Sequence, residues 1–476
     1  MIKLVNRYAY AGGSTNNRTP YQWSGALSIV ALVVLGTHSP IFALGAMGIA
    51  AMQIVFGEED FSWKLIFFLF SFANIFKLAP GSTSLFTYLI LLFDVMLFIR
   101  HRTLPPLWIF FAIYTVAVPF ISMDASNFNL LRWIKLLCSL LMMCYFFEWE
   151  QKGNEDEIFI YFIVGVILAS LTYYLNSGFF RITRYVLSDN TVTYRGVSEA
   201  ERVMMRFSGL YSDPNYYSVN VIISMCLVVI LFHRDRISMP VSGLLIAVLL
   251  YFVKETYSKS SLLMMVLPIC MFLYSNQIKR KGGLQAAAIV GIVAVIVYLL
   301  ATGGGSMFSV VFSRLSSAEG DLNSLTTGRF NIWMNNIAYF AEHPGALLWG
   351  QGINAKLLNG RAHHNVYLEM LWHLGVVGGC MFFSLLRQIL NSTSHRKKRN
   401  PLNGSILCCI VVMYSFLSVL FYFDPPYHIM IAFTVLNMDL SYHEALQGNH
   451  RELGSEKTDK GRENDENAEI CKSSAV

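Results

Sequence analysis

Long apolar runs separated by short polar turns follow one another along most of the chain. They recur about fourteen times, and most approach the roughly 17 to 25 residues that an α-helix needs to cross a bilayer. The pattern predicts an all-α fold, a polytopic membrane bundle of about 12 to 14 transmembrane helices. The runs lie near 24–37, 40–57, 62–77, 83–99, 104–122, 128–147, 157–176, 215–232, 239–255, 259–275, 284–301, 365–387, 405–423 and 427–441.

Two gaps between these runs are far longer than the others. Both hold several arginines, and functional residues concentrate in such loops. In the second gap, apolar residues recur at helical spacing at Phe330, Trp333, Ile337 and Phe340, which predicts an interfacial helix at the membrane surface. The predicted layout is a cytoplasmic N-terminal segment (1–23), N-terminal transmembrane helices (24–176), a first long loop (177–214), central transmembrane helices (215–301), a second long loop (302–364), C-terminal transmembrane helices (365–441) and a disordered tail (442–476).

Composition supports a membrane protein. Hydrophobic residues make up 55% of the 476 residues and charged residues only 14%, with a mean hydropathy of +0.48, whereas a soluble domain carries about a quarter charged residues. The formal net charge is +6, and basic residues cluster near 100–102, 233–236, 279–281 and 395–399. If the spans alternate in direction, these clusters lie on one side of the membrane. The positive-inside rule makes that side cytoplasmic, with both termini, so the excess of Lys and Arg indicates topology and no nucleic-acid partner. The eight cysteines lack metal-ligand spacing, so no metal site is predicted.

A transporter is the first alternative. Ion-coupled carriers usually hold ionisable residues deep in their helices and are built from internal repeats. The predicted spans hold few such residues, chiefly Asp94, Lys135 and Glu369, and the two halves show no repeat. Lys135 follows Arg132 by three residues, so both lie on one helix face, where they could bind a phosphate or extend to the membrane interface.

The first polar motif is MMRFSGLYSDPN at 204–215. Asp213 or Asn215 is expected to cap the helix that follows. Arg206 is either a solvated loop charge or part of an anion site, since a guanidinium binds two phosphate oxygens and helix N-terminal amides add positive potential.

Two further loops supply cations. TYSKSSLL at 256–263 puts Lys259 between two serines in a short turn, where it is either an ordinary loop lysine or a cation of the site. TTGRF at 326–330 opens the predicted interfacial helix with a cap and turn, and Arg329 stands in its first turn.

A histidine pair opens the next apolar run in HHNVYLEMLWHLGVVGG at 363–379. Counted from His364, the residues Tyr367, Leu371, Gly375 and Gly378 trace one helix face, on which the glycines let a neighbouring backbone approach. His364 is therefore expected at the outer end of a face that points into the bundle.

At that place His364, with Asn365 beside it, could take a proton from a sugar hydroxyl near neutral pH. The alternative is a histidine at a membrane interface without chemistry. His363 is expected to be solvated, and His373, about opposite His364 on a regular helix, to take no part.

Together these segments resemble the O-antigen ligase and O-antigen polymerase superfamily. Its members are membrane glycosyltransferases that use undecaprenyl-diphosphate-linked glycans at the periplasmic face of the bacterial inner membrane. The resemblance covers about 200–390, and at position 259 this chain has Lys where the family often has Arg. The matching motifs are His364, Asn365, Gly375 and Gly378; Arg206, Gly209, Asp213, Pro214 and Asn215; Thr327, Gly328 and Arg329; and Ser258 with Lys259.

The resemblance implies an inverting, metal-independent glycosyltransferase without a cofactor, in which both long loops are periplasmic. Arg206 and Arg329 would stabilise the departing lipid diphosphate, and His364 would orient or deprotonate the acceptor hydroxyl. Asp213 and Asn215 are expected to fix their loop rather than react. The predicted substrate-binding residues are Arg206, Arg329, Lys259, Lys135, Asn365, Asn215, Asp213 and Tyr367.

Three activities remain open at this point. A polymerase, favoured by the many spans and the long tail, would join the glycan to another lipid-linked repeat unit, and a chain-length regulator is then a candidate partner. A ligase would join it to lipid A-core. A flippase would move the same lipid-linked oligosaccharide across the membrane without needing the His or the Thr-Gly-Arg opening.

Overall fold

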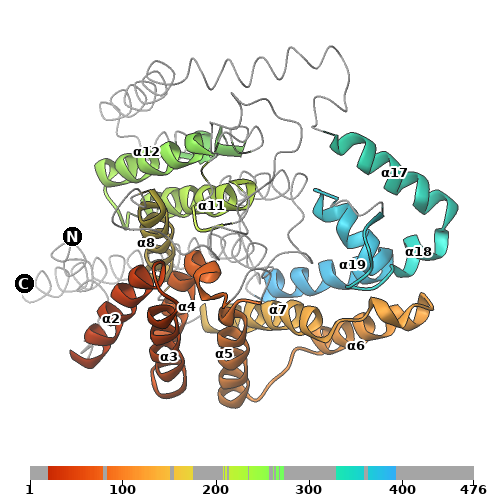
Figure 1. Ribbon diagram of the computed structural model, residues 1–476, viewed down its shortest axis with the longest axis horizontal. Coiled ribbons are helices and arrows are strands. Elements are labelled where there is room, and N and C mark those ends of the chain that lie inside the picture. Colours follow the sequence, from red (N-terminus) through yellow and green to blue (C-terminus); the bar gives the residue numbers. More distant parts are fainter. Residues whose placement is uncertain are drawn as a thin grey trace, which may run out of the picture.

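The computed structural model is helical throughout its regular structure, and the residues it describes contain no strand. The all-α prediction is therefore confirmed over this part of the chain. The described residues are 20–78, 83–150, 155–174, 207, 209–211, 214–233, 235–256, 261, 264–266, 268–272, 328–358 and 363–392. The elements, shown in Figure 1, are α2 (Pro20–Gly36), α3 (Pro40–Phe56), α4 (Glu59–Leu69), η1 (Phe70–Phe76), α5 (Leu85–His101), α6 (Pro106–Ile121), η2 (Ala125–Asn127), α7 (Leu130–Glu150), α8 (Glu155–Tyr174), α11 (Pro214–His233), α12 (Met239–Glu255), α17 (Arg329–Glu342), α18 (Pro344–Trp349) and α19 (Val366–Ser392).

Every apolar run predicted between 24 and 255 corresponds to a helix, as does 365–387. Residues 37–39 form a turn between two helices. The helix α2 ends at Gly36, and Pro40 starts α3, a position where its missing N–H costs nothing. The predicted runs at 284–301, 405–423 and 427–441 lie outside the described residues.

One described helix, Val366–Leu385, is long and apolar enough to cross a membrane. Shorter apolar helices occur at Ala26–Gly36, Pro40–Phe56, Pro106–Ile121 and Tyr217–His233. The number of spans and the predicted topology therefore stay predictions.

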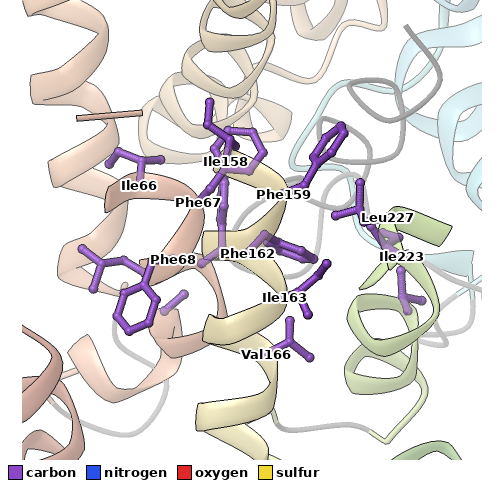
Figure 2. Packing of buried hydrophobic residues seen from close by; sticks show 14 of the residues in the cluster. Ile66, Phe67, Phe68, Ile158, Phe159, Phe162, Ile163, Val166, Ile223 and Leu227 are labelled. Carbon is purple, nitrogen blue, oxygen red and sulfur yellow. The ribbon is translucent and has the colours of Figure 1, made fainter. Parts of the chain in front are cut away.

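The main core joins α4, α8 and α11. Figure 2 shows α8 between the other two helices, with Phe159, Phe162 and Ile163 packed among their side chains. A Cβ on Gly165 of α8 would lie 2.6 Å from the carbonyl oxygen of Phe68, so the missing side chain lets α4 approach.

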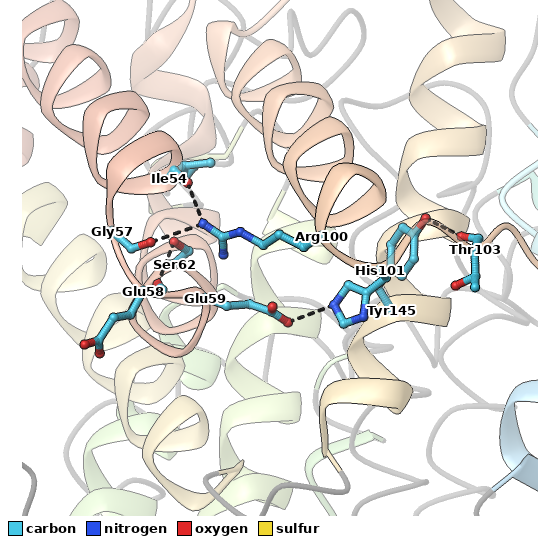
Figure 3. A network of polar contacts seen from close by, with 9 residues as sticks. All are labelled: Ile54, Gly57, Glu58, Glu59, Ser62, Arg100, His101, Thr103 and Tyr145. Carbon is cyan, nitrogen blue, oxygen red and sulfur yellow. Dashed lines mark hydrogen bonds and ion pairs between the residues drawn. The ribbon is translucent and has the colours of Figure 1, made fainter.

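The basic cluster at 100–102 has a structural role at helix ends (Figure 3). Arg100 Nη2 donates to the carbonyl oxygens of Ile54 (3.4 Å) and Gly57 (3.1 Å), where α3 ends and its last carbonyls lack helical partners. His101 Nε2 lies 3.2 Å from Glu59 Oε1.

Further ion pairs extend this cluster. Lys64 is buried in α4 and contacts Asp60 one turn earlier and Glu157 of α8. Arg236, after α11, pairs with Asp156. Charged residues thus tie α4, α8 and the turn before α12 together.

A second, smaller cluster holds α17 and α18 to the first half of α19. Its buried members are Phe340, Ala355 and Trp372, and it is separate from the main core. Of the predicted apolar stripe on α17, Phe340 is buried but Ile337 is 52% exposed. These three helices lie together on one side of Figure 1 and carry most of the candidate site.

Candidate functional site

Helix α19 is broken at Gly375, which has φ 64° and ψ −174°. The prediction of a regular helix with both motif glycines on one face is therefore wrong. A Cβ at Gly375 would lie 2.4 Å from the backbone nitrogen of Gly350. The expected close backbone approach does occur, and only glycine adopts this conformation readily.

The break leaves carbonyls of the preceding turn without helical partners. The loop after α18 supplies two of the replacements: Gln351 N donates to Trp372 O (2.8 Å) and Gly352 N to His373 O (3.0 Å). In return, His373 Nδ1 donates to Gly352 O at 2.7 Å. His373 is thus a buried residue that holds the loop against the helix.

Tyr114 of α6 supplies the third replacement. Its hydroxyl lies 2.7 Å from Leu374 O and 2.9 Å from Trp349 O, so it ties α6 to both sides of the glycine contact. A Cβ on Gly378 would lie 2.4 Å from the Tyr114 ring. The second motif glycine therefore makes room for this tyrosine.

His363 is fully buried, so the prediction that it is solvated is wrong. Its side chain reaches α17, where Nε2 lies 2.9 Å from Asn336 Oδ1. Asn336 Nδ2 donates to Ile332 O at 2.7 Å, which leaves Oδ1 as the acceptor and makes His363 Nε2 the donor. Trp333 Nε1 also donates to the His363 carbonyl at 2.9 Å.

The charge state of His363 follows from this burial. Loss of solvation lowers its pKa from 6.5 to about 4, and the nearby charge of His364 acts in the same direction. His363 is therefore a neutral imidazole at physiological pH, fixed as the Nε2–H tautomer. In the part of the chain that the structure describes, its Nδ1 has no hydrogen-bond partner.

His364 stands before the helix and not on it, because α19 begins at Val366. It is half-buried and has φ 49°, a left-handed conformation that costs a residue with a side chain about 1 to 2 kcal/mol. The angle predicted from a regular helix between His364 and His373 therefore does not apply.

Asn365 is the N-cap of α19. Its Oδ1 accepts hydrogen bonds from Tyr367 N (3.0 Å) and Leu368 N (3.1 Å), which satisfies two amides at the helix start. Tyr367 packs against the main core, whereas Leu371 packs against the small cluster, so the predicted single face is divided. Substrate binding by Asn365 and Tyr367 stays a prediction.

Arg329 is the first residue of α17, as its Thr-Gly-Arg motif predicted, with Gly328 as the N-cap at φ 82°. It precedes Trp333 by four residues and Asn336 by seven, a spacing that puts all three on one helix face. Trp333 and Asn336 on that face contact His363, and Arg329 lies one turn before Trp333. The predicted Thr327 cap lies outside the described residues.

Lys135 is half-buried in α7, one turn after Arg132. The loop after α18 reaches this region, since Asn354 N donates to Asn127 O (2.9 Å) just before α7. Arg132 lies within electrostatic range of His373. The first turn of α7 therefore borders the site, and phosphate binding by Lys135 stays a prediction.

The motif around 206 is only partly described. Arg206 and Asp213 lie outside the described residues, as does Lys259. Gly209 has φ 55°, and a Cβ on it would lie 2.6 Å from the Tyr217 ring, which explains a glycine there. Asn215 lies in the first turn of α11, and its carbonyl accepts from Ser218 Oγ at 2.7 Å.

Residues 244–383 match a protein-family model described as O-Antigen ligase. This segment of the chain is similar to the O-antigen ligase family. This match confirms the resemblance to the O-antigen ligase and polymerase superfamily over these residues and supports a membrane enzyme of polysaccharide biosynthesis that uses lipid-linked glycans. No curated protein and no solved structure matches the chain.

The matched residues include Arg329, His364 and the break of α19 at Gly375. The sequence did not point to three residues of the candidate site. Asn336 and His363 lie inside the matched range, and Tyr114 lies outside it. One signal was present: Asn336 is four residues before Phe340 and so puts an amide on the face of α17 that packs inward.

Proposed function

We propose that this protein is an O-antigen polymerase, an inverting glycosyltransferase that extends a surface polysaccharide at the periplasmic face of the bacterial inner membrane. The donor is a glycan on undecaprenyl diphosphate, and the acceptor is a hydroxyl of another lipid-linked repeat unit. The observation that carries the proposal is the match of the O-antigen ligase family to residues 244–383, a range that includes Arg329 and His364.

In the proposed reaction the acceptor oxygen attacks the anomeric carbon from the side opposite the diphosphate. The new glycosidic bond forms as the bond to the diphosphate oxygen breaks, and the lipid diphosphate leaves with the electron pair. The hydroxyl proton passes to His364 and then to water. Arg329, with Arg206, Lys259 and Lys135, stabilises the growing negative charge of the leaving group.

A ligase is the second candidate. The matched family is described as O-Antigen ligase, and a ligase uses the same donor with lipid A-core as the acceptor. A site built on Arg329 and His364 would serve either acceptor. The family match favours both of these glycosyltransferases over the flippase.

Deletion of the gene in its natural host separates the candidates. Loss of a polymerase leaves single repeat units on the surface, loss of a ligase leaves polymer on the lipid carrier, and loss of a flippase leaves units inside the cell. Return of the intact chain should restore the ladder of glycan lengths, whereas Arg329→Ala and His364→Ala should not, at equal protein levels in the membrane. Normal ladders from either variant would refute the assignment of its residue.

A further inference from the structure

The residue before His364 is anchored to one helix and the residue after it starts another. On the first side, His363 is held by two bonds to α17, its carbonyl to Trp333 Nε1 and its Nε2–H to Asn336 Oδ1, each at 2.9 Å. On the second side, Asn365 caps α19. His364 itself has the left-handed φ of 49°.

This conformation needs an external cause. A residue with a side chain enters the left-handed region at a cost of about 1 to 2 kcal/mol, and it persists where the surroundings determine it. The two anchors provide that cause, because they fix the chain on both sides of one residue. Asn336 is 1% exposed and His363 fully buried, so water does not compete for their bond.

The anchors also relate His364 to the cation of the site. Trp333 and Asn336 lie one and two turns after Arg329 on the same face of α17. A bond from this face to His363 therefore fixes α17, and with it Arg329, relative to the backbone of His364.

We propose that His363 and Asn336 are positioning residues, whose bond between α17 and the start of α19 holds His364 and Arg329 in their reactive arrangement. This inference rests on the proposed function and extends it to residues that touch neither donor nor acceptor. A misplacement of about 1 Å can reduce a rate roughly 100-fold. Loss of the bond should therefore reduce kcat while leaving the affinity for the glycan largely unchanged.

The test compares variants of the purified full-length protein in lipid vesicles, with a lipid-linked repeat unit as donor and acceptor. His363→Leu removes the bond to Asn336. His363→Gln keeps an N–H donor at the position of Nε2. The matched control is His343→Leu. His343 is an exposed histidine at the end of α17, and its ring nitrogen Nδ1 bonds to the carbonyl of Tyr339 in the same helix.

His363→Leu should reduce kcat per folded molecule about 10- to 100-fold with KM changed less than about threefold. His363→Gln should restore kcat to within about threefold of the unaltered protein, and His343→Leu should match it. Unaltered kcat in folded His363→Leu would overturn the proposal, as would equal loss in the Gln and Leu variants.

If His363→Leu does not accumulate, Trp333→Phe removes the indole N–H that donates to the His363 carbonyl and keeps an aromatic ring at this position. It should reduce kcat in the same sense, and an unchanged kcat would overturn the proposal. The unaltered protein and His364→Ala are measured in parallel. If the unaltered protein makes no product, or if His364→Ala keeps full activity, the proposed function itself is refuted. If these two proteins behave as expected and the positioning variants do not, only the inference about His363 and Asn336 fails.

Discussion

Replacement of Gly375 with Ala tests the break in α19. At φ 64° and ψ −174° an alanine is strained by about 1 to 3 kcal/mol. Its Cβ would lie 2.4 Å from Gly350 N and 2.5 Å from Leu348 O, and both are backbone atoms that cannot move alone. Such overlap adds about 1 to 3 kcal/mol, so the variant should lose about 2 to 6 kcal/mol of stability.

Gly379 provides the matched control, four residues further along the same helix. A Cβ there would meet only Met370 Sδ, at an ordinary 3.7 Å. Gly379→Ala should leave stability unchanged or raise it by about 0.5 to 1 kcal/mol, because alanine favours a helix. Both variants are heated in detergent, and size-exclusion chromatography measures the folded fraction that remains at each temperature. Equal unfolding temperatures would refute the break at Gly375 and favour a regular helix.

Three further predictions concern stability and are each measured by unfolding in detergent. Tyr114→Phe removes the hydroxyl that bonds carbonyls at the helix break and should cost about 1 to 3 kcal/mol; no loss would mean that water replaces it. Lys64→Met removes a buried cation that contacts two carboxylates, and it should destabilise the protein more than Arg236→Ala does. The Arg236 side chain is 47% exposed, so its ion pair contributes less than about 1 kcal/mol. A larger loss of stability in Arg236→Ala would contradict the difference in burial. His363 lowers stability in acid, because the unfolded chain binds its proton below about pH 6.5 and the folded protein only near pH 4. Each pH unit between these two pKa values changes the free energy of unfolding by about 1.4 kcal/mol. Stability should therefore fall between pH 6.5 and 4 more steeply in the unaltered protein than in His363→Gln. Parallel curves of stability against pH would contradict a neutral, buried His363.

The helices could be predicted from the sequence because each apolar run is long and bounded by turns. Pro40 marks the start of α3 by its missing N–H, and the aromatic spacing around Phe340 marks α17. These signals are local, so they need no knowledge of the partner. The motif around Arg329 and His364 was found in the same way.

The arrangement within the site could not be predicted because it depends on contacts between distant segments. Glycine occurs both within helices and at helix breaks. At Gly375 the break goes with the close approach of the Gly350 backbone, a contact that the sequence does not show. Two adjacent loop histidines look equivalent in sequence. Only His363 is buried and bonded to Asn336, which lies 27 positions away. The buried Lys64 was missed because its partner on α8 is far away along the chain.

Transfer of a labelled repeat unit in vesicles tests the central claim most directly. The purified protein is supplied with undecaprenyl-diphosphate-linked repeat units, of which a fraction carries the label, and lipid A-core is added as a competing acceptor. A polymerase should release undecaprenyl diphosphate and make labelled glycans of two or more units on the lipid carrier, and Arg329→Ala and His364→Ala should make none. Label on lipid A-core alone, or no transfer by the unaltered protein, would contradict the account.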